Sequence, residues 1–117
     1  MKKREFEILN NQDELQGVLV AKGKDEFEIM LDKQNTDVLD IAFRQWKNRG
    51  FTVVPENLSK SWVEERVIPP NRQGIEEVLV DFGLTEYNLL DMLLATNGRC
   101  QLDSSYIREI NPMTEGK

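Results

Sequence analysis

Apolar and polar side chains alternate in short segments at the start of the chain, and this period of two restricts them to β-strands. The segments are residues 4–10, 15–22 and 26–32. In the first, Phe6 and Ile8 fall on one face while Glu5 and Glu7 fall on the other. The second is apolar on both faces, as in a strand with a neighbour on either side. Turns rich in Asn, Asp and Gly separate the segments, so the sequence predicts an antiparallel β-meander.

A helical pattern follows over about residues 37–49, between Thr36 in the N-cap position and Gly50 in the C-cap position. Its apolar residues recur three and four apart along the chain. They are Val38, Leu39, Ala42, Phe43 and Trp46. We expect this stripe to pack on the meander as part of the core. Residues 51–54 then predict a short fourth strand that Pro55 closes.

The second half predicts a helical hairpin. Asn71 can cap a first helix that Gly83 ends, with Ile75, Val78, Leu79 and Phe82 facing inward. Thr85 can cap a second helix, which is apolar almost all round and is therefore expected to be buried. Residues 105–110 predict a last strand. The predicted fold is a single α+β domain, with the meander and one helix in residues 1–55, an irregular connector in 56–71, and the hairpin with a tail in 72–117.

The net charge of −6, from 21 acidic and 15 basic side chains, bears on the choice of partner. Phosphate backbones repel an acidic protein, so we expect a protein partner with a basic surface and no direct contact with nucleic acid. The single cysteine excludes an intramolecular disulfide and fits a reducing cytoplasm. The longest apolar runs fall far short of the roughly 20 residues that span a bilayer. We therefore expect a cytoplasmic protein that does not contact membranes.

The chain contains no histidine. Histidine is the usual general base near neutral pH and the commonest metal ligand in proteins. Its absence excludes Ser-His and Cys-His nucleophile pairs and nearly all zinc sites. We therefore expect no enzymatic activity, no cofactor and no bound metal.

Acidic residues dominate the stretch from Ile75 to Gly98, which has no Lys or Arg. They are Glu76, Glu77, Asp81, Glu86 and Asp91. The helical wheel places Glu77 and Asp81 away from the apolar face, so this acidic edge could occupy a basic groove that normally holds nucleic acid. A solvated helix face is the structural alternative.

The two helices around Gly83-Leu84-Thr85 have the spacing of a helix-turn-helix, which would put the second helix in a DNA major groove. That helix carries Glu86 and Asp91 where base-reading Arg or Lys would be needed, so a hairpin packed for stability is the preferred interpretation. Basic residues that could contact phosphate lie earlier in the chain. They are Arg44, Lys47, Arg49, Arg66 and Arg72.

Two apolar side chains are candidate anchors of an interface. Trp62 lies in the connector, where the sequence predicts no regular structure. Ile41 falls on the polar side of its helix.

Three stretches, Arg66-Val-Ile-Pro-Pro-Asn-Arg-Gln-Gly-Ile-Glu-Glu, Phe82-Gly-Leu-Thr-Glu-Tyr and Thr96-Asn-Gly-Arg, resemble small acidic proteins carried by phages, plasmids and conjugative elements of Gram-positive bacteria. Some proteins of that setting are anti-CRISPR proteins, which inhibit Cas9. The resemblance covers about the C-terminal 50 residues and brings no functional residue with it. It implies an inhibitor that blocks the basic guide and target channel of a Cas9-type nuclease.

The sequence therefore leaves three hypotheses. The first is a non-enzymatic, protein-binding inhibitor encoded by a mobile element, directed at a Cas9-type nuclease. The second is a small DNA-binding transcriptional regulator that uses the helical hairpin. The third is a structural or scaffolding module that dimerises through an edge of the sheet.

Overall fold

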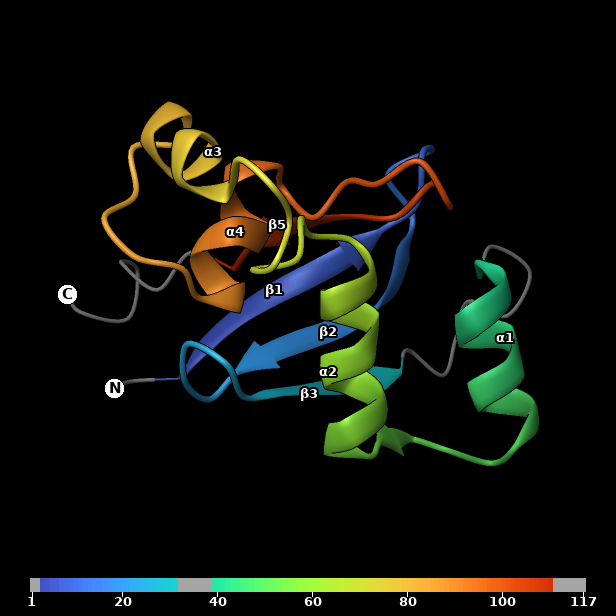
Figure 1. Ribbon diagram of the computed structural model, residues 1–117. Coiled ribbons are helices and arrows are strands. Elements are labelled where there is room, and N and C mark those ends of the chain that lie inside the picture. The colour runs from blue at the N-terminus through green and yellow to red at the C-terminus, as the bar shows by residue number, and fades with distance from the viewer. Residues whose placement is uncertain (1–2, 32–38, 111–117) are drawn as a thin grey trace, which may run out of the picture.

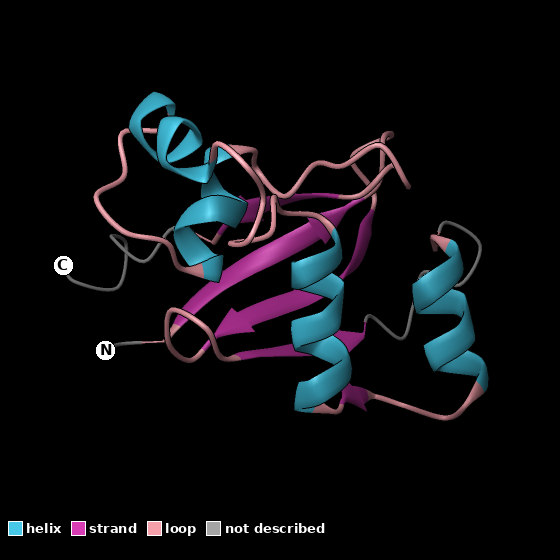
Figure 2. Ribbon diagram, viewed as in Figure 1, coloured by secondary structure: helices cyan, strands magenta, loops and turns pink. Residues whose placement is uncertain are grey.

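A five-stranded antiparallel sheet forms the centre of the computed structural model, which describes residues 3–31 and 39–110 (Figures 1 and 2). The strand order is β4-β3-β2-β1-β5. The strands are β1 (Arg4–Leu9), β2 (Leu15–Ala21), β3 (Phe27–Leu31), β4 (Val53–Val54) and β5 (Tyr106–Glu109). The helices are α1 (Ile41–Asn48), α2 (Glu56–Glu65), α3 (Ile75–Asp81) and α4 (Leu89–Ala95). The predicted α+β class is confirmed.

The predicted meander forms, with β1 paired to β2 and β2 paired to β3. Phe6, Leu19 and Ile29 are neighbours in register, so their side chains share one face of the sheet, where all three are buried. β2 is the central strand, and Leu19 and Val20, which point to opposite faces of it, are both buried.

The last strand completes the sheet beside the first. The sequence predicts a strand at residues 105–110 but not its partner. β5 pairs antiparallel with β1, with Ile107 opposite Ile8 and Glu109 opposite Phe6. Residues from the two ends of the chain thus lie side by side in one sheet (Figure 1).

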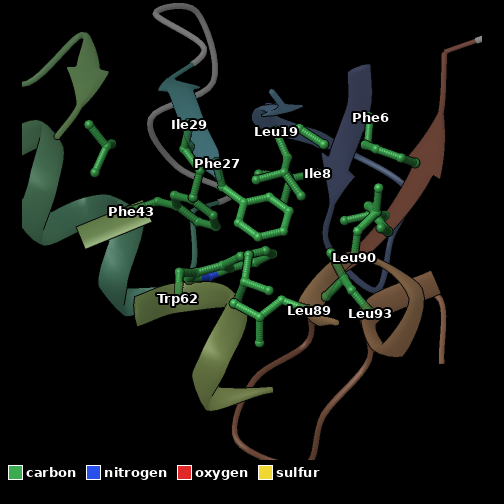
Figure 3. Packing of buried hydrophobic residues seen from close by; sticks show 14 of the residues in the cluster. Phe6, Ile8, Leu19, Phe27, Ile29, Phe43, Trp62, Leu89, Leu90 and Leu93 are labelled. Atoms are coloured by element: carbon green, nitrogen blue, oxygen red, sulfur yellow. The ribbon is translucent and has the colours of Figure 1, made fainter. Parts of the chain in front are cut away.

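The core lies between the sheet and the helices in front of it, as Figure 3 shows. The sheet contributes Phe6, Ile8, Leu19, Phe27 and Ile29 to the core, α1 and α2 contribute Phe43 and Trp62, and α4 contributes Leu89, Leu90 and Leu93. The rings of Phe43 and Trp62 are 5.8 Å apart between centroids. The prediction that the last helix is buried is confirmed, because an element that is apolar almost all round has no face suited to water.

The helix predicted from residue 37 begins at Ile41, with Asp40 in the N-cap position. Thr36 and Val38 lie outside the described residues. Leu39 and Phe43 belong to the core, and Ala42 and Trp46 pack against it, as the apolar stripe predicts. The helix ends before Gly50, which has a positive φ of 86°.

The prediction of an irregular connector at residues 56–71 is wrong for its first part, which forms α2 and packs against β3. Pro55 occupies the N-cap position, where its missing N–H removes no bond within the helix. Leu58, Trp62 and Val63 recur at helical spacing and turn toward the core. The prediction gave the low helix propensity of Asn and Ser more weight than this spacing, and tertiary packing overrides such propensities.

Ser59 of α2 joins two strands at the edge of the sheet. Its hydroxyl accepts a hydrogen bond from the backbone N–H of Ile29 at 3.0 Å and donates to the carbonyl of Val54 at 3.2 Å. The side chain is fully buried, so water cannot replace it. α2 thereby fastens β3 to β4, whose ladder is short.

Replacing Ser59 with alanine is expected to lower the free energy of unfolding by about 1–3 kcal/mol, because a buried N–H and a buried carbonyl lose their partner. Ser61→Ala, at an exposed site of the same helix, is the matched control. It should leave stability unchanged or raise it by a few tenths of a kcal/mol, since alanine is the better helix former. Urea denaturation followed by circular dichroism measures both, and equal effects would contradict this role of Ser59.

Candidate functional site

α3 lies at the periphery of the molecule and ends in a regular glycine cap (Figure 1). The N–H of Gly83 donates to the carbonyl of Val80 at 2.9 Å, and the N–H of Leu84 donates to that of Leu79 at 2.8 Å. These two bonds are the pattern of a Schellman motif, which requires a positive φ at Gly83, observed at 74°. The predicted end of this helix at Gly83 is confirmed.

The predicted start of this helix at Asn71 is wrong, because Gly74, with a left-handed φ of 82°, holds the N-cap position. The side chains predicted to face inward are half-buried, and α3 has no buried residue. They are Ile75, Val78, Leu79 and Phe82. A helix this short at the periphery rests on the fold with one face and leaves the other face in water.

The exposed face of α3 carries three carboxylates around one apolar side chain. We call Glu76, Glu77, Val80 and Asp81 the acidic face. Val80 is 75% exposed, and the three acidic residues beside it are also exposed. Together these four residues line a shallow hollow of about 390 Å³. The structure therefore brings together three of the five acidic residues singled out from the sequence.

Helix stability explains only half of the acidic face. Glu76 and Glu77 lie in the first turn, where negative charge is favourable next to the positive end of the helix dipole. Asp81 lies in the last turn, where the same dipole disfavours it, and Glu77 four residues earlier repels it. Val80 gains no burial. The side chains of Asp81 and Val80 thus do not stabilise the helix.

The other two acidic residues lie elsewhere. Glu86 is exposed in the loop between α3 and α4. Asp91 is half-buried in the first turn of α4: its N–H donates to the Asn88 Oδ1 at 2.8 Å, and its carboxylate accepts from the Asn88 Nδ2 at 2.8 Å. Asn88 therefore caps this helix, and the prediction of Thr85 as the cap is wrong.

The helix-turn-helix interpretation does not fit this geometry. Residues 82–88 separate the two helices, in place of a three-residue turn. The would-be recognition helix α4 packs against the sheet with Leu89, Leu90 and Leu93 in the core. A helix that supplies the core cannot enter a DNA groove.

Two further site predictions are wrong for the same reason, burial. Trp62, predicted as an interface anchor, is 3% exposed because α2 turns its ring into the core. Arg66, predicted as a phosphate contact, is 6% exposed. Its guanidinium lies 3.9 Å from the centroid of the Trp62 ring, and it donates to the Gly98 carbonyl at 2.6 Å and to Asp103 at 2.5 Å.

The remaining basic residues do not form one patch. Arg44 and Lys47 lie on α1, and Arg49 follows it, with its guanidinium 5.0 Å from the Phe51 ring centroid. Arg72 precedes α3, at the opposite end of the molecule from α1 (Figure 1). The exposed members of the predicted set of phosphate contacts therefore lie in two distant places, and the remaining member, Arg66, is buried.

The prediction that Ile41 is exposed is confirmed, at 66%. It lines a hollow of about 250 Å³ together with Leu102, which is 79% exposed, and with Asp40 and Arg44. No pattern in the sequence marks Leu102 as a candidate site residue, because its stretch of the chain has no periodicity. Only the fold brings this stretch beside α1.

A buried polar network behind this hollow was not predicted from the sequence. The side chain of Gln16 donates to the Ser105 hydroxyl at 2.8 Å and accepts from the N–H of Asp40 at 2.7 Å. The Ser105 hydroxyl also donates to the Asp40 carboxylate. The N–H of Ser105 donates to Asp103, which the Arg66 guanidinium also binds. Gln16 and Ser105 are buried, so these groups hold the fold rather than meet a substrate.

Side-chain contacts fasten β5 on both faces of the sheet. Arg4 makes two hydrogen bonds to Glu109, at 2.7 and 2.8 Å, and these bonds lower the pKa of the Glu109 carboxyl below its usual range. The Tyr106 hydroxyl donates to Asp13, which raises the pKa of that tyrosine.

Within residues 3–31 and 39–110, the structure has no group of three or more Cys, Asp or Glu side chains arranged to hold a metal ion. Among the same residues, no helix is long and apolar enough to cross a membrane. Comparison of the chain with protein-family models, with curated proteins and with solved structures found no match.

Arg66→Ala is expected to lower the free energy of unfolding by about 3 kcal/mol, as for a broken buried ion pair. The change removes the Arg66 donor from the Gly98 carbonyl, leaves Asp103 with the Ser105 N–H but without its cation, and removes a cation from the Trp62 ring. The control is Arg72→Ala, an exposed arginine whose loss should change stability by less than about 0.5 kcal/mol. Urea denaturation distinguishes the two variants. If Arg66→Ala leaves the free energy of unfolding unchanged, the contacts of Arg66 do not stabilise the fold.

Asp81→Asn is expected to raise the free energy of unfolding by about 0.3–0.5 kcal/mol at low salt, because it relieves repulsion at the negative end of α3. Glu76→Gln, at the other end of the helix, should lower it by a similar amount. Changes of opposite sign in the free energy of unfolding of these two variants would show that the Asp81 carboxylate does not stabilise the fold. A loss of stability in Asp81→Asn would mean that this carboxylate has a structural partner.

Proposed function

We propose that this chain is a non-enzymatic protein-binding module that uses the acidic face of α3 to occupy a basic surface of another protein. The observation that carries the proposal is Val80, 75% exposed among three carboxylates on a helix with no buried residue. Protein interfaces combine an apolar centre, which excludes water, with a charged rim that sets orientation and speed of encounter. The acidic face has this arrangement on a small scale.

The net charge of −6 supports the same kind of partner. The excess of carboxylates attracts a basic protein over a distance and repels free nucleic acid. A surface that binds RNA or DNA is basic, so an acidic module can compete for it. The chain would then act by keeping a nucleic acid off the partner protein that normally binds it.

The resemblance of the C-terminal stretches to mobile-element proteins suggests which basic partner to examine first. The first of these stretches ends at Glu76 and Glu77, in the acidic face. We propose a Cas9-type nuclease as the partner and its guide and target channel as the basic surface. On this proposal the chain is an inhibitor encoded by a mobile element.

A binding assay with purified Cas9 proteins, with and without guide RNA, tests the partner. We expect binding to the RNA-free nuclease and weaker binding once guide RNA fills the channel. Absence of binding in both states, for several Cas9 orthologues, would contradict this choice of partner but leave the acidic face open for others.

A triple charge reversal tests the acidic face in the same assay. Glu76→Lys, Glu77→Lys and Asp81→Lys together should weaken binding about 100-fold, at about 1 kcal/mol for each lost contact. The matched control reverses Glu56, Glu64 and Glu65 of α2, which are exposed and give the same change in net charge. If both triple variants lose affinity equally, only net charge matters and the acidic face is not the binding site.

A further inference from the structure

The two edges of the sheet differ in how their backbone groups are used. At the β4 side, the hydroxyl of Ser59 in α2 bridges the N–H of Ile29 in β3 and the C=O of Val54 in β4, where their short ladder ends. At the other edge, β5 directs alternate residues toward β1, as the hydrogen bond of 2.9 Å from the Ile110 N–H to the Glu5 carbonyl shows. In an antiparallel ladder the inward and outward residues alternate, so Ile107 and Glu109 direct their N–H and C=O groups away from β1.

Only part of this outer edge is occupied. The N–H of Ile107 donates to the carbonyl of Asn97 at 2.8 Å, which closes one end of the edge. Among the residues that the structure describes, the backbone N–H and C=O of Glu109 have no partner. A row of free backbone groups on an edge strand is a template for another strand.

A hollow of about 420 Å³ follows this edge. All four residues of β5 line it, and Phe6, Leu94, Asn97 and Arg99 form the rest of its wall. Because the lining includes side chains from both faces of the strand, the hollow wraps around the edge and gives an incoming chain room on either side. Leu94 supplies the half-buried apolar side chain of this wall, whereas Phe6 and Ile107 are buried in the core behind it.

The charge around the hollow is opposite to that of the whole chain. The guanidinium of Arg99 lies 4.4 Å from the Tyr106 ring centroid, and no carboxylate of the described residues pairs with it. Arg108 has only an exposed contact with Glu7 at 3.0 Å, which contributes little and can be exchanged. The one acidic residue of the lining, Glu109, is neutralised by Arg4.

We propose that the outer edge of β5 is a strand-addition site for an extended, acidic segment of a partner protein. The incoming strand pairs with the free backbone groups of Glu109, and its acidic side chains meet Arg99 and Arg108. Backbone hydrogen bonds supply affinity in this mode of recognition, and alternate side chains supply specificity. The site is separate from the acidic face of α3, so either can fail while the other holds.

A second copy of the chain is a poor occupant of the same edge. Two antiparallel β5 strands can pair through their outward residues in two registers that use Glu109. One register sets Glu109 opposite its own copy, and the other sets Arg108 opposite its own copy. The second register places like charges directly opposite each other, which destabilises a strand pair, and the first, whose carboxylates are each paired with Arg4, brings no acidic group to Arg108. An acidic segment instead meets complementary charge in Arg99 and Arg108.

A library of random nine-residue peptides displayed on phage, selected on the full chain, tests the proposal. We expect enriched peptides to carry Asp or Glu at alternate positions. Their affinity should fall about 10-fold or more in Glu109→Pro, which removes the outward N–H while sparing the bonds to β1, as proline does at the edge of a sheet. Glu109→Ala is the matched comparison, because it loses the same contact with Arg4 but keeps the N–H, so the peptides should bind it about 10-fold more tightly than they bind Glu109→Pro.

Arg99→Glu provides a test that leaves the backbone intact, in case Glu109→Pro does not fold. Selection on this variant should no longer enrich acidic peptides. The proposal is overturned if no peptide is enriched, if enriched peptides bind Glu109→Pro as tightly as Glu109→Ala, or, where Glu109→Pro does not fold, if Arg99→Glu selects the same acidic peptides. A dimer in sedimentation experiments that Glu109→Pro alone dissociates would assign the edge to a second copy and also overturn it.

Discussion

The fold depends on satisfying polar groups that are removed from water. Gln16 in the central strand and Ser105 before the last strand are buried, and each would cost about 1–3 kcal/mol without a partner. They meet each other and Asp40, while Asp103 links them to the guanidinium of Arg66. These few hydrogen bonds connect the sheet, the start of α1, the end of α2 and the loop that leads to β5. The loop, which has little apolar content of its own, is fixed by them.

Both candidate binding surfaces follow from this arrangement. The fixed loop places β5 beside β1, so the sheet ends in a strand whose outer edge is partly covered by Asn97 among the residues that the structure describes. α4 fills the core in front of that strand, and α3 is left at the periphery with one face free. The chain thus combines a net negative charge, concentrated in part on α3, with a locally basic sheet edge. This separation of charge favours one orientation of approach for any partner.

Local signals in the sequence predicted the elements that depend on near neighbours. Alternation located β1, β2 and β3, and glycine at Gly50 and Gly83 located two helix ends. The helical wheel placed Glu77 and Asp81 on an exposed face, where they lie. The burial of Arg66 could not be predicted, because it depends on Gly98 and Asp103, which are more than 30 positions away. The Asn and Ser residues of the α2 segment favoured a loop, but the segment forms a helix that packs against β3.

The pairing of β1 with β5 has a consequence for the growing chain. β1 is synthesised well before β5, so β1 has no neighbour on one side until residues 106–109 emerge. Contacts between such distant residues form slowly, and an unpaired strand is prone to aggregate in the meantime. Arg4, Glu5 and Glu7 place charges along this strand, and charged side chains discourage pairing between chains. Arg4 later holds β5 itself through its two hydrogen bonds to Glu109, so a charge that opposes wrong pairing also stabilises the correct pairing.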